Sequence, residues 1–173
     1  MDDARRVVEV QIGRPPRGDV TVAARCEFGL PLVVRTSARL EDGTPFPTLY
    51  WLCCPIAVRE AGRLESSGLM AELTARLGED ESFAAAYRDA HERYRVDRDG
   101  DANGDAASAG GMPGRVKCLH ALYAHERADA NPVGSIVRER IEPLPCPGPC
   151  VTAAADGKPR RVDGHPGFKG RRR

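Results

Sequence analysis

Hydrophobic and polar residues alternate with a period of two in the first third of the chain, which is the pattern of half-buried β-strands. The alternation that begins at Val20 continues to Cys26, so the Cys26 thiol is expected to point inward with the valines. The next strand follows after Glu27–Pro31, which predicts a hairpin between the two. The predicted strands cover residues 8–12, 20–26, 32–36 and 48–54.

From residue 56 onward the apolar spacing changes to that of amphipathic helices. Gly78 suits the end of one of these helices, and Pro113 suits the first position of another. The predicted helices cover about 56–65, 69–78, 83–94, 113–123 and 133–140. We therefore predict an α+β fold, in which a small antiparallel sheet from the N-terminal third packs against four or five helices.

The same patterns divide the chain into one domain and a tail. A length of 173 residues fits a single domain, which we place at residues 1–152. Residues 97–111 are rich in Asp, Gly, Ala and Ser without an apolar period, so we expect a mobile acidic loop there. Residues 153–173 form a basic segment, with seven Lys or Arg against two Asp from residue 156 onward, and we expect this tail to be disordered.

Composition and charge restrict the class of protein. Apolar residues make up 41% and charged residues 29%, which excludes the disordered and membrane classes. A formal net charge of +1 gives no general attraction to nucleic acid or to anionic lipid, so neither is an expected partner. The segment Met1–Arg6 is not followed by the apolar core of a signal peptide, and we expect a cytoplasmic protein. In that reducing compartment, the six cysteines are expected to be thiols or metal ligands.

Four cysteines are the strongest candidates for chemistry, because they come from separate predicted elements and would meet only by tertiary convergence. These candidate metal ligands are Cys26, Cys54, Cys118 and Cys150. The chain has no C-x-x-C pair, which is the usual local sign of zinc, and Cys54 precedes a proline as some iron–sulfur ligands do. We predict an iron–sulfur cluster in a structural or redox role, with zinc as the alternative.

Two other interpretations of the cysteines stay open. Free cysteine is among the most buried residue types, so all of these thiols could be apolar core side chains. The segment Cys146-Pro-Gly-Pro-Cys150 could also chelate a metal locally.

A continuous helix would separate the donor groups of the segment 118–125. At about 100° per residue, Cys118 and His120 would lie on opposite faces, and Cys118 and His125 would be about 10 Å apart along the axis. We therefore predict that His120 is a core histidine and that His125 lies near the surface at the helix end. The same geometry disfavours an enzyme with Cys118 as nucleophile and His120 as base.

The remaining motifs suggest binding more weakly. Asp99–Asp105 opens like a calcium loop, but Gly110 stands where the bidentate glutamate is required, so we expect a solvated acidic loop. Gly13-Arg-Pro-Pro-Arg-Gly18 presents two guanidinium groups on a stiff loop. The alternative function is therefore a metal-free interaction module that binds an acidic protein partner, RNA or polyphosphate through Arg-rich loops. Neither a P-loop nor a G-x-S-x-G motif is present in the sequence.

Several longer motifs resemble those of a known family. These motifs are Val10–Gly18, Ala24–Cys26, Asp42–Trp51, Cys54–Pro55 and Gly110–His120. The chain resembles the actinobacterial family designated domain of unknown function 501 over residues 7–152. The resemblance implies that Cys26, Cys54 and Cys118 occupy positions where the family carries cysteine, that Cys150 is the candidate fourth, and that Cys53 is an addition. The family has no established activity, so the resemblance implies no reaction.

Overall fold

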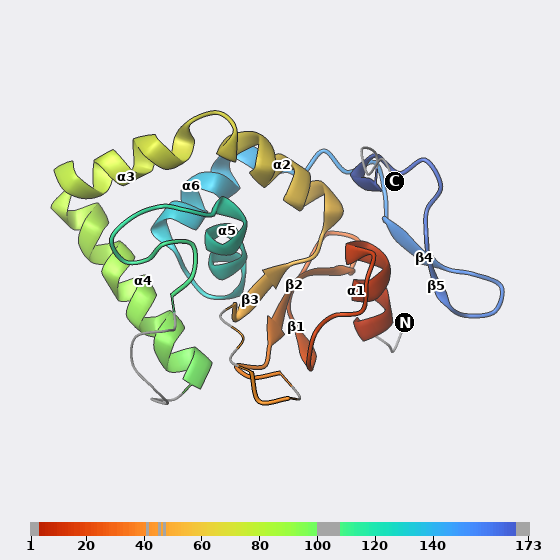
Figure 1. Cartoon of the computed structure of the whole chain (residues 1–173). Coiled ribbons are helices and arrows are strands. Elements are labelled where there is room, and N and C mark those ends of the chain that lie inside the picture. Colours follow the sequence, from red (N-terminus) through yellow and green to blue (C-terminus); the bar gives the residue numbers. More distant parts are fainter. Residues whose placement is uncertain (1–3, 41, 45, 47, 100–107, 169–173) are drawn as a thin grey trace.

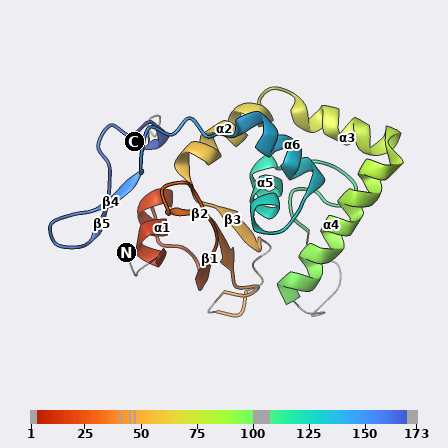
Figure 2. The ribbon, with the colours of Figure 1, turned by 180° about the vertical axis from the view of Figure 1, so that it is seen from behind.

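A three-stranded antiparallel sheet lies at the centre of the computed structural model, which describes residues 4–40, 42–44, 46, 48–99 and 108–168 (Figure 1). The strands are β1 (Val20–Arg25), β2 (Pro31–Thr36) and β3 (Tyr50–Leu52), in the order β1-β2-β3. Together with the helices around the sheet, this arrangement confirms the predicted α+β fold. Figures 1 and 2 show α1 on one side of the sheet and α5 on the other.

The first two strands form the predicted hairpin. Val22 pairs with Val34, and the amide of Cys26 donates to the carbonyl of Leu30 to close the turn. Within the turn, Gly29 has φ +72°, a conformation that side chains with a Cβ rarely adopt. Burial alternates along β1, and Cys26 continues its half-buried face, so the alternation was interpreted correctly.

The predicted strand at residues 8–12 is wrong, because this segment belongs to helix α1 (Ala4–Ile12). Val7, Val8 and Gln11 are its buried residues, a spacing of one and four that only a helix places on one face. The helix covers the sheet, where the Gln11 side-chain amide donates to the carbonyl of Pro31 at 2.9 Å. A short segment can satisfy both periods at once, and here the helical one agrees with the tertiary packing.

The helices on the other side of the sheet match the prediction in order and approximate length. They are α2 (Pro55–Glu65), α3 (Leu69–Glu79), α4 (Glu81–Asp99), α5 (Leu119–Ala128) and α6 (Pro132–Ile141). In Figure 1, α3 and α4 form the outer edge of the helical part of the molecule, and α5 and α6 lie between them and the sheet. The expectation that Pro113 begins a helix is wrong, because α5 begins only at Leu119, after a turn that contains a cis Met112–Pro113 bond. None of the described helices is both long enough and apolar enough to cross a membrane.

Two short strands order much of the C-terminal segment that was expected to be disordered. They are β4 (Val151–Ala153) and β5 (Pro159–Arg161), followed by a 3₁₀ helix at Pro166–Phe168. Val151 is buried against Val7, and the Arg161 guanidinium donates to the carbonyl of Val10 while it lies 4.5 Å from the Phe168 ring. These contacts with α1 hold the hairpin in place. No periodic pattern in the sequence predicts them. Most of the acidic loop that we expected, residues 100–107, lies outside the described residues.

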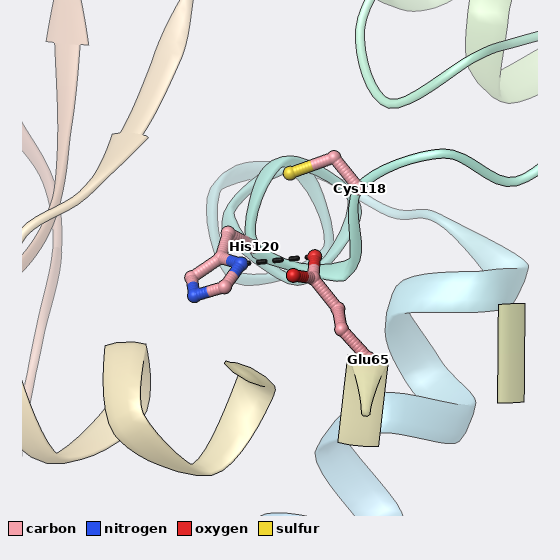
Figure 3. A group of neighbouring side chains, drawn as sticks. All are labelled: Glu65, Cys118 and His120. Atoms are coloured by element: carbon pink, nitrogen blue, oxygen red, sulfur yellow. Dashed lines mark hydrogen bonds and ion pairs between the residues drawn. The ribbon is translucent and has the colours of Figure 1, made fainter. Parts of the chain in front are cut away.

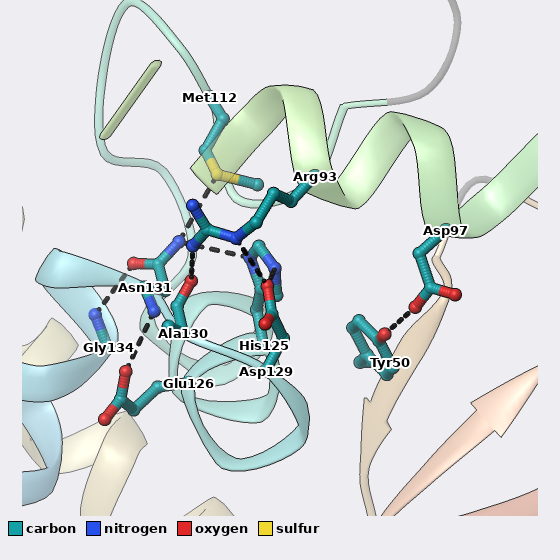
Figure 4. A network of polar contacts seen from close by, with 10 residues as sticks. All are labelled: Tyr50, Arg93, Asp97, Met112, His125, Glu126, Asp129, Ala130, Asn131 and Gly134. Carbon is teal, nitrogen blue, oxygen red and sulfur yellow. Dashed lines mark hydrogen bonds and ion pairs between the residues drawn. The ribbon is translucent and has the colours of Figure 1, made fainter. Parts of the chain in front are cut away.

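His125 is buried inside a polar network between α4, α5 and β3 (Figure 4), so the prediction of a surface position is wrong. Its ring stacks on Tyr50 with centroids 5.6 Å apart, and its Nδ1 accepts from the Asn131 side-chain amide at 3.3 Å. Asp129 lies 3.5 Å from Nε2. Burial lowers the pKa of His125 to about 4, although the nearby Asp129 carboxylate acts in the opposite direction.

This buried histidine predicts a loss of stability in mild acid. The pKa of His125 is lower in the folded protein than the unfolded value near 6.5, so the unfolded chain binds more protons between these values. The free energy of unfolding should therefore fall by about 2 kcal/mol from pH 7 to pH 5 through this group. Urea unfolding at both pH values measures the change. The variant His125→Phe, which keeps an aromatic ring in the same place, should lose this part of the pH dependence, and equal slopes in the two proteins would contradict the assignment.

Candidate metal centre

Three potential metal ligands meet where the end of α2 faces the start of α5 (Figure 3). They are Glu65, Cys118 and His120, and one donor atom of each lies within 4.8 Å of the other two. Within the part of the chain that the structure describes, no other group of three His, Cys, Asp or Glu donors is this close together. The three side chains are all half-buried, so they are partly shielded from water but still accessible.

The local backbone explains how Cys118 and His120 come together. Cys118 is not helical: it is the N-cap of α5, with φ −149° and ψ 107°. The prediction that the two side chains lie on opposite faces assumed a helix that already included residue 118, and it is wrong for that reason. His120 is also half-buried beside α2 rather than part of the core.

The His120 ring is held at both nitrogens. Nδ1 lies 3.0 Å from a carboxylate oxygen of Glu65, and Nε2 lies 2.9 Å from the carbonyl oxygen of Val58. In Figure 3, Cys118 and Glu65 lie toward the Nδ1 edge of the ring, while Nε2 points away from both. A metal-binding histidine commonly donates its second N–H to a carbonyl, which fixes the tautomer and the orientation of the ring. The bond to Val58 supplies this support.

Glu65 is fixed by its contact with the next helix. Its carboxylate accepts the backbone N–H of Leu119 at 2.7 Å, one of the amides that the start of a helix leaves unpaired. Burial tends to raise the pKa of Glu65, but the hydrogen bond and charge of His120 outweigh it and the pKa is lowered. The hydrogen bond with Cys118 is the largest influence on His120 and, with Glu65, raises its pKa to about 9 against the effect of burial. Glu65 and His120 therefore stabilise each other's charged forms.

Cys118 and His120 lie in the wall of a cavity of about 600 Å³, a size typical of small-molecule sites. Aromatic side chains, Trp51 from β3 and Phe168 from the C-terminal 3₁₀ helix, form part of its lining. Arg14, from the Arg-rich loop singled out in the sequence, also lines this cavity and lies 5.6 Å from the Trp51 ring. The candidate metal centre therefore lies beside a partly apolar cavity whose lining includes the guanidinium group of Arg14.

The other predicted ligands gather elsewhere. Cys26, Cys54 and Cys150 line a second cavity, of about 230 Å³, and Cys146 joins them there. The structure thus brings three of the four predicted ligands to one place and puts Cys118 in the wall of the other cavity. Cys53 lines the larger cavity instead, and its Sγ lies 3.3 Å from the carbonyl oxygen of Leu32.

Burial favours the protonated form of three thiols in the second cavity, those of Cys54, Cys146 and Cys150. All six cysteines of the chain are described and are free thiols. Burial raises the pKa of Cys54 to about 12, and the neighbouring Cys150 and Cys26 add to this effect against the backbone amides of Ala57 and Ile56. Burial also raises the pKa of Cys146 and of Cys150. A neutral buried thiol is a poor nucleophile, and it becomes a metal ligand only when the metal displaces its proton.

Comparison with known families places the chain. A family described as "Protein of unknown function (DUF501)" matches residues 22–139, which is more than half of the chain. The chain belongs to the DUF501 family. The match confirms the resemblance to this family over residues 22–139, a range that includes Glu65, Cys118 and His120. No curated protein and no solved structure matches the chain.

Sequence reasoning identified Cys118 in this DUF501 chain but missed its partners. Glu65 is 53 positions before Cys118 and ends an ordinary amphipathic helix, so no local spacing marks it as a ligand. The sequence feature that could have revealed the pairing is Cys118-Leu-His120 at the start of a helix. A residue at the N-cap has an extended backbone, and its side chain turns toward the first turn of the helix, where His120 lies. For Cys146, the sequence suggests only a local pair of ligands with Cys150.

Proposed function

We propose that this DUF501 protein binds a single zinc ion through Glu65, Cys118 and His120, with a fourth position open to the larger cavity. The observation that carries the proposal is the approach of three donor atoms to within 4.8 Å of one another, with the far nitrogen of His120 bound to the Val58 carbonyl. Ordinary surface groups also cluster, but they lack this combination of a mixed ligand set and a fixed ring.

The ligand set supports zinc in particular. Zinc is borderline in softness and binds cysteine, histidine and carboxylate side chains together. With bond lengths of about 2.0–2.3 Å, tetrahedral ligands are about 3.3–3.8 Å apart, so the three donor atoms need to move only slightly. The Cys118 thiol would lose its proton on binding, and the thiolate at the start of α5 would benefit from the helix dipole.

The number of protein ligands favours a zinc ion that acts on a bound molecule over a purely structural zinc ion. Structural zinc sites are normally closed by four protein ligands, whereas three ligands with an open position are typical of catalytic sites. Zinc in such a site can polarise a carbonyl or phosphoryl oxygen of a bound molecule. The cavity beside Cys118 and His120 supplies room for such a molecule, and the Arg14 side chain in its wall favours one with a negative charge.

A nucleophilic cysteine is the competing use of the same residues. In such a site the histidine bonds the thiol through one ring nitrogen and an orienting acid through the other. Here His120 does interact with Cys118, but Glu65 bonds the ring on the same side as the thiol, and the far nitrogen bonds only the backbone carbonyl of Val58, so no acid orients the ring from behind. This arrangement suits convergence on an ion better than relay of a proton.

Titration of the metal-free protein with zinc tests the proposal. We expect one equivalent to bind with an affinity that resists a moderate chelator, and we expect this equivalent to disappear in Cys118→Ser. The matched control is Cys26→Ser, which changes another half-buried thiol outside the site and should keep it. Retention of the zinc by Cys118→Ser, or absence of binding in the wild type, would refute the assignment.

A further inference from the structure

Four thiols that are distant in the sequence line the second cavity. Cys26 follows β1, Cys54 precedes α2, and Cys146 and Cys150 lie in the segment between α6 and β4. We propose that this cavity is a second metal site, and that it holds an iron–sulfur cluster on Cys26, Cys54, Cys146 and Cys150. The inference is independent of the zinc centre, because the two sites share no residue.

The spacing of the sulfurs disfavours a single ion held by all four thiols. Four thiolates around one zinc ion, at about 2.3 Å each, would be about 3.8 Å apart. Among the described residues, no three of these sulfur atoms lie within 4.8 Å of one another. In a cluster with four irons each thiolate binds a different iron, so its ligands surround a larger core.

The cavity that the thiols line is larger than a single ion requires. Its volume of about 230 Å³ is several times the roughly 30 Å³ that one water occupies in the liquid. Its wall combines apolar side chains such as Leu32 with two arginines, Arg25 and Arg127, and two glutamates, Glu27 and Glu142. Iron–sulfur sites tune their clusters by such burial and by nearby charge.

A hydrogen bond to one of the sulfurs adds support. The side-chain amide of Gln11 donates to Cys150 Sγ at 3.6 Å, and this amide is itself buried beneath α1. Donors to a ligand sulfur stabilise a thiolate and its bound cluster. Cys26 and Cys146 are half-buried while Cys54 and Cys150 are buried, so the cluster would lie at the edge of the core, where oxygen reaches it.

Anaerobic purification of the full chain tests this site, with iron and acid-labile sulfide measured per protein and a visible absorption spectrum recorded. If cluster was lost during purification, the apo protein is reconstituted with ferrous iron and sulfide. We expect both elements and a broad visible band in the wild type, and their loss in Cys26→Ser and Cys146→Ser. These two variants change half-buried positions, and far-UV circular dichroism checks that they fold.

The matched control is Cys118→Ser, which should keep iron and sulfide although it loses zinc. Iron and sulfide that persist in both cavity variants would overturn the inference, as would a wild-type protein that takes up neither element even after reconstitution. Zinc bound by four sulfurs in place of a cluster would also overturn it. Since zinc and iron are measured in the same samples, failure of one site is distinguishable from failure of the other.

Discussion

Replacing His120 by alanine is expected to lower the affinity for zinc by at least about 100-fold, because loss of a group that merely supports a ligand already costs about 10–100-fold. At zinc concentrations about 100 times the wild-type dissociation constant, the metal should add about 2.7 kcal/mol to the free energy of unfolding, and this gain should fall to about 0.4 kcal/mol or less in His120→Ala. Competition with a chelator measures the affinity, and urea unfolding with and without zinc measures the gain.

Two further variants locate this effect at the proposed centre. Glu65→Gln should weaken zinc binding in the same direction, because a neutral amide is a poorer ligand than a carboxylate. Glu60→Gln, on the same helix but paired with Arg59 at 2.8 Å, should leave the affinity unchanged. Equal affinities for wild type and His120→Ala would show that zinc, if it binds, is held elsewhere.

Substitution of Gly134 by alanine is expected to destabilise the fold severely. At this position α6 crosses α5 so closely that an added Cβ would lie 2.2 Å from the carbonyl oxygen of Leu122 and 2.5 Å from Glu126 Cβ. The amide of Gly134 also donates to the Asn131 side chain that caps the helix, so the backbone cannot shift without losing that bond. We expect the free energy of unfolding to fall by about 3 kcal/mol or more, measured by urea denaturation.

A glycine in open space provides the comparison. Gly78 lies near the end of α3, and nothing is within 4 Å of an added Cβ. Gly78→Ala should therefore be neutral or up to about 1 kcal/mol more stable, because alanine is the better helix former. A Gly134→Ala protein as stable as this control would show that the two helices are less closely packed than described.

Much of the fold follows from patterns within single segments. The hairpin of β1 and β2 and the helices α2, α3, α4 and α6 have a clear period and recognisable turns, and the sequence predicts each of them. The errors arise where the period is ambiguous or where distant contacts decide. Residues 8–12 satisfy a strand pattern and a helix pattern, and only packing against the sheet distinguishes them. The hairpin of β4 and β5 depends on contacts with α1 that are 151 positions distant.

In the candidate sites too, the sequence predicts what depends on local geometry and misses what depends on contacts between distant segments. Cys53 and Cys54 line different cavities, because neighbouring residues of an extended segment point to opposite sides, which is a matter of local geometry. The grouping of Cys118 with Glu65 depends on where α2 ends relative to α5, which is a tertiary property. The predicted helix begins at Pro113, whereas α5 begins at Leu119, and leaving Cys118 outside the helix reverses the expected relation between Cys118 and His120. The sequence therefore identifies cysteines as candidate ligands, while the partners of each cysteine require the fold.

Zinc K-edge X-ray absorption on protein loaded with one equivalent of zinc tests the proposed centre most directly. The account predicts one sulfur ligand at about 2.3 Å and nitrogen or oxygen ligands at about 2.0–2.2 Å, with the sulfur contribution lost in Cys118→Ser. A first shell without sulfur, or one with three or four sulfurs, would contradict a centre formed by Glu65, Cys118 and His120.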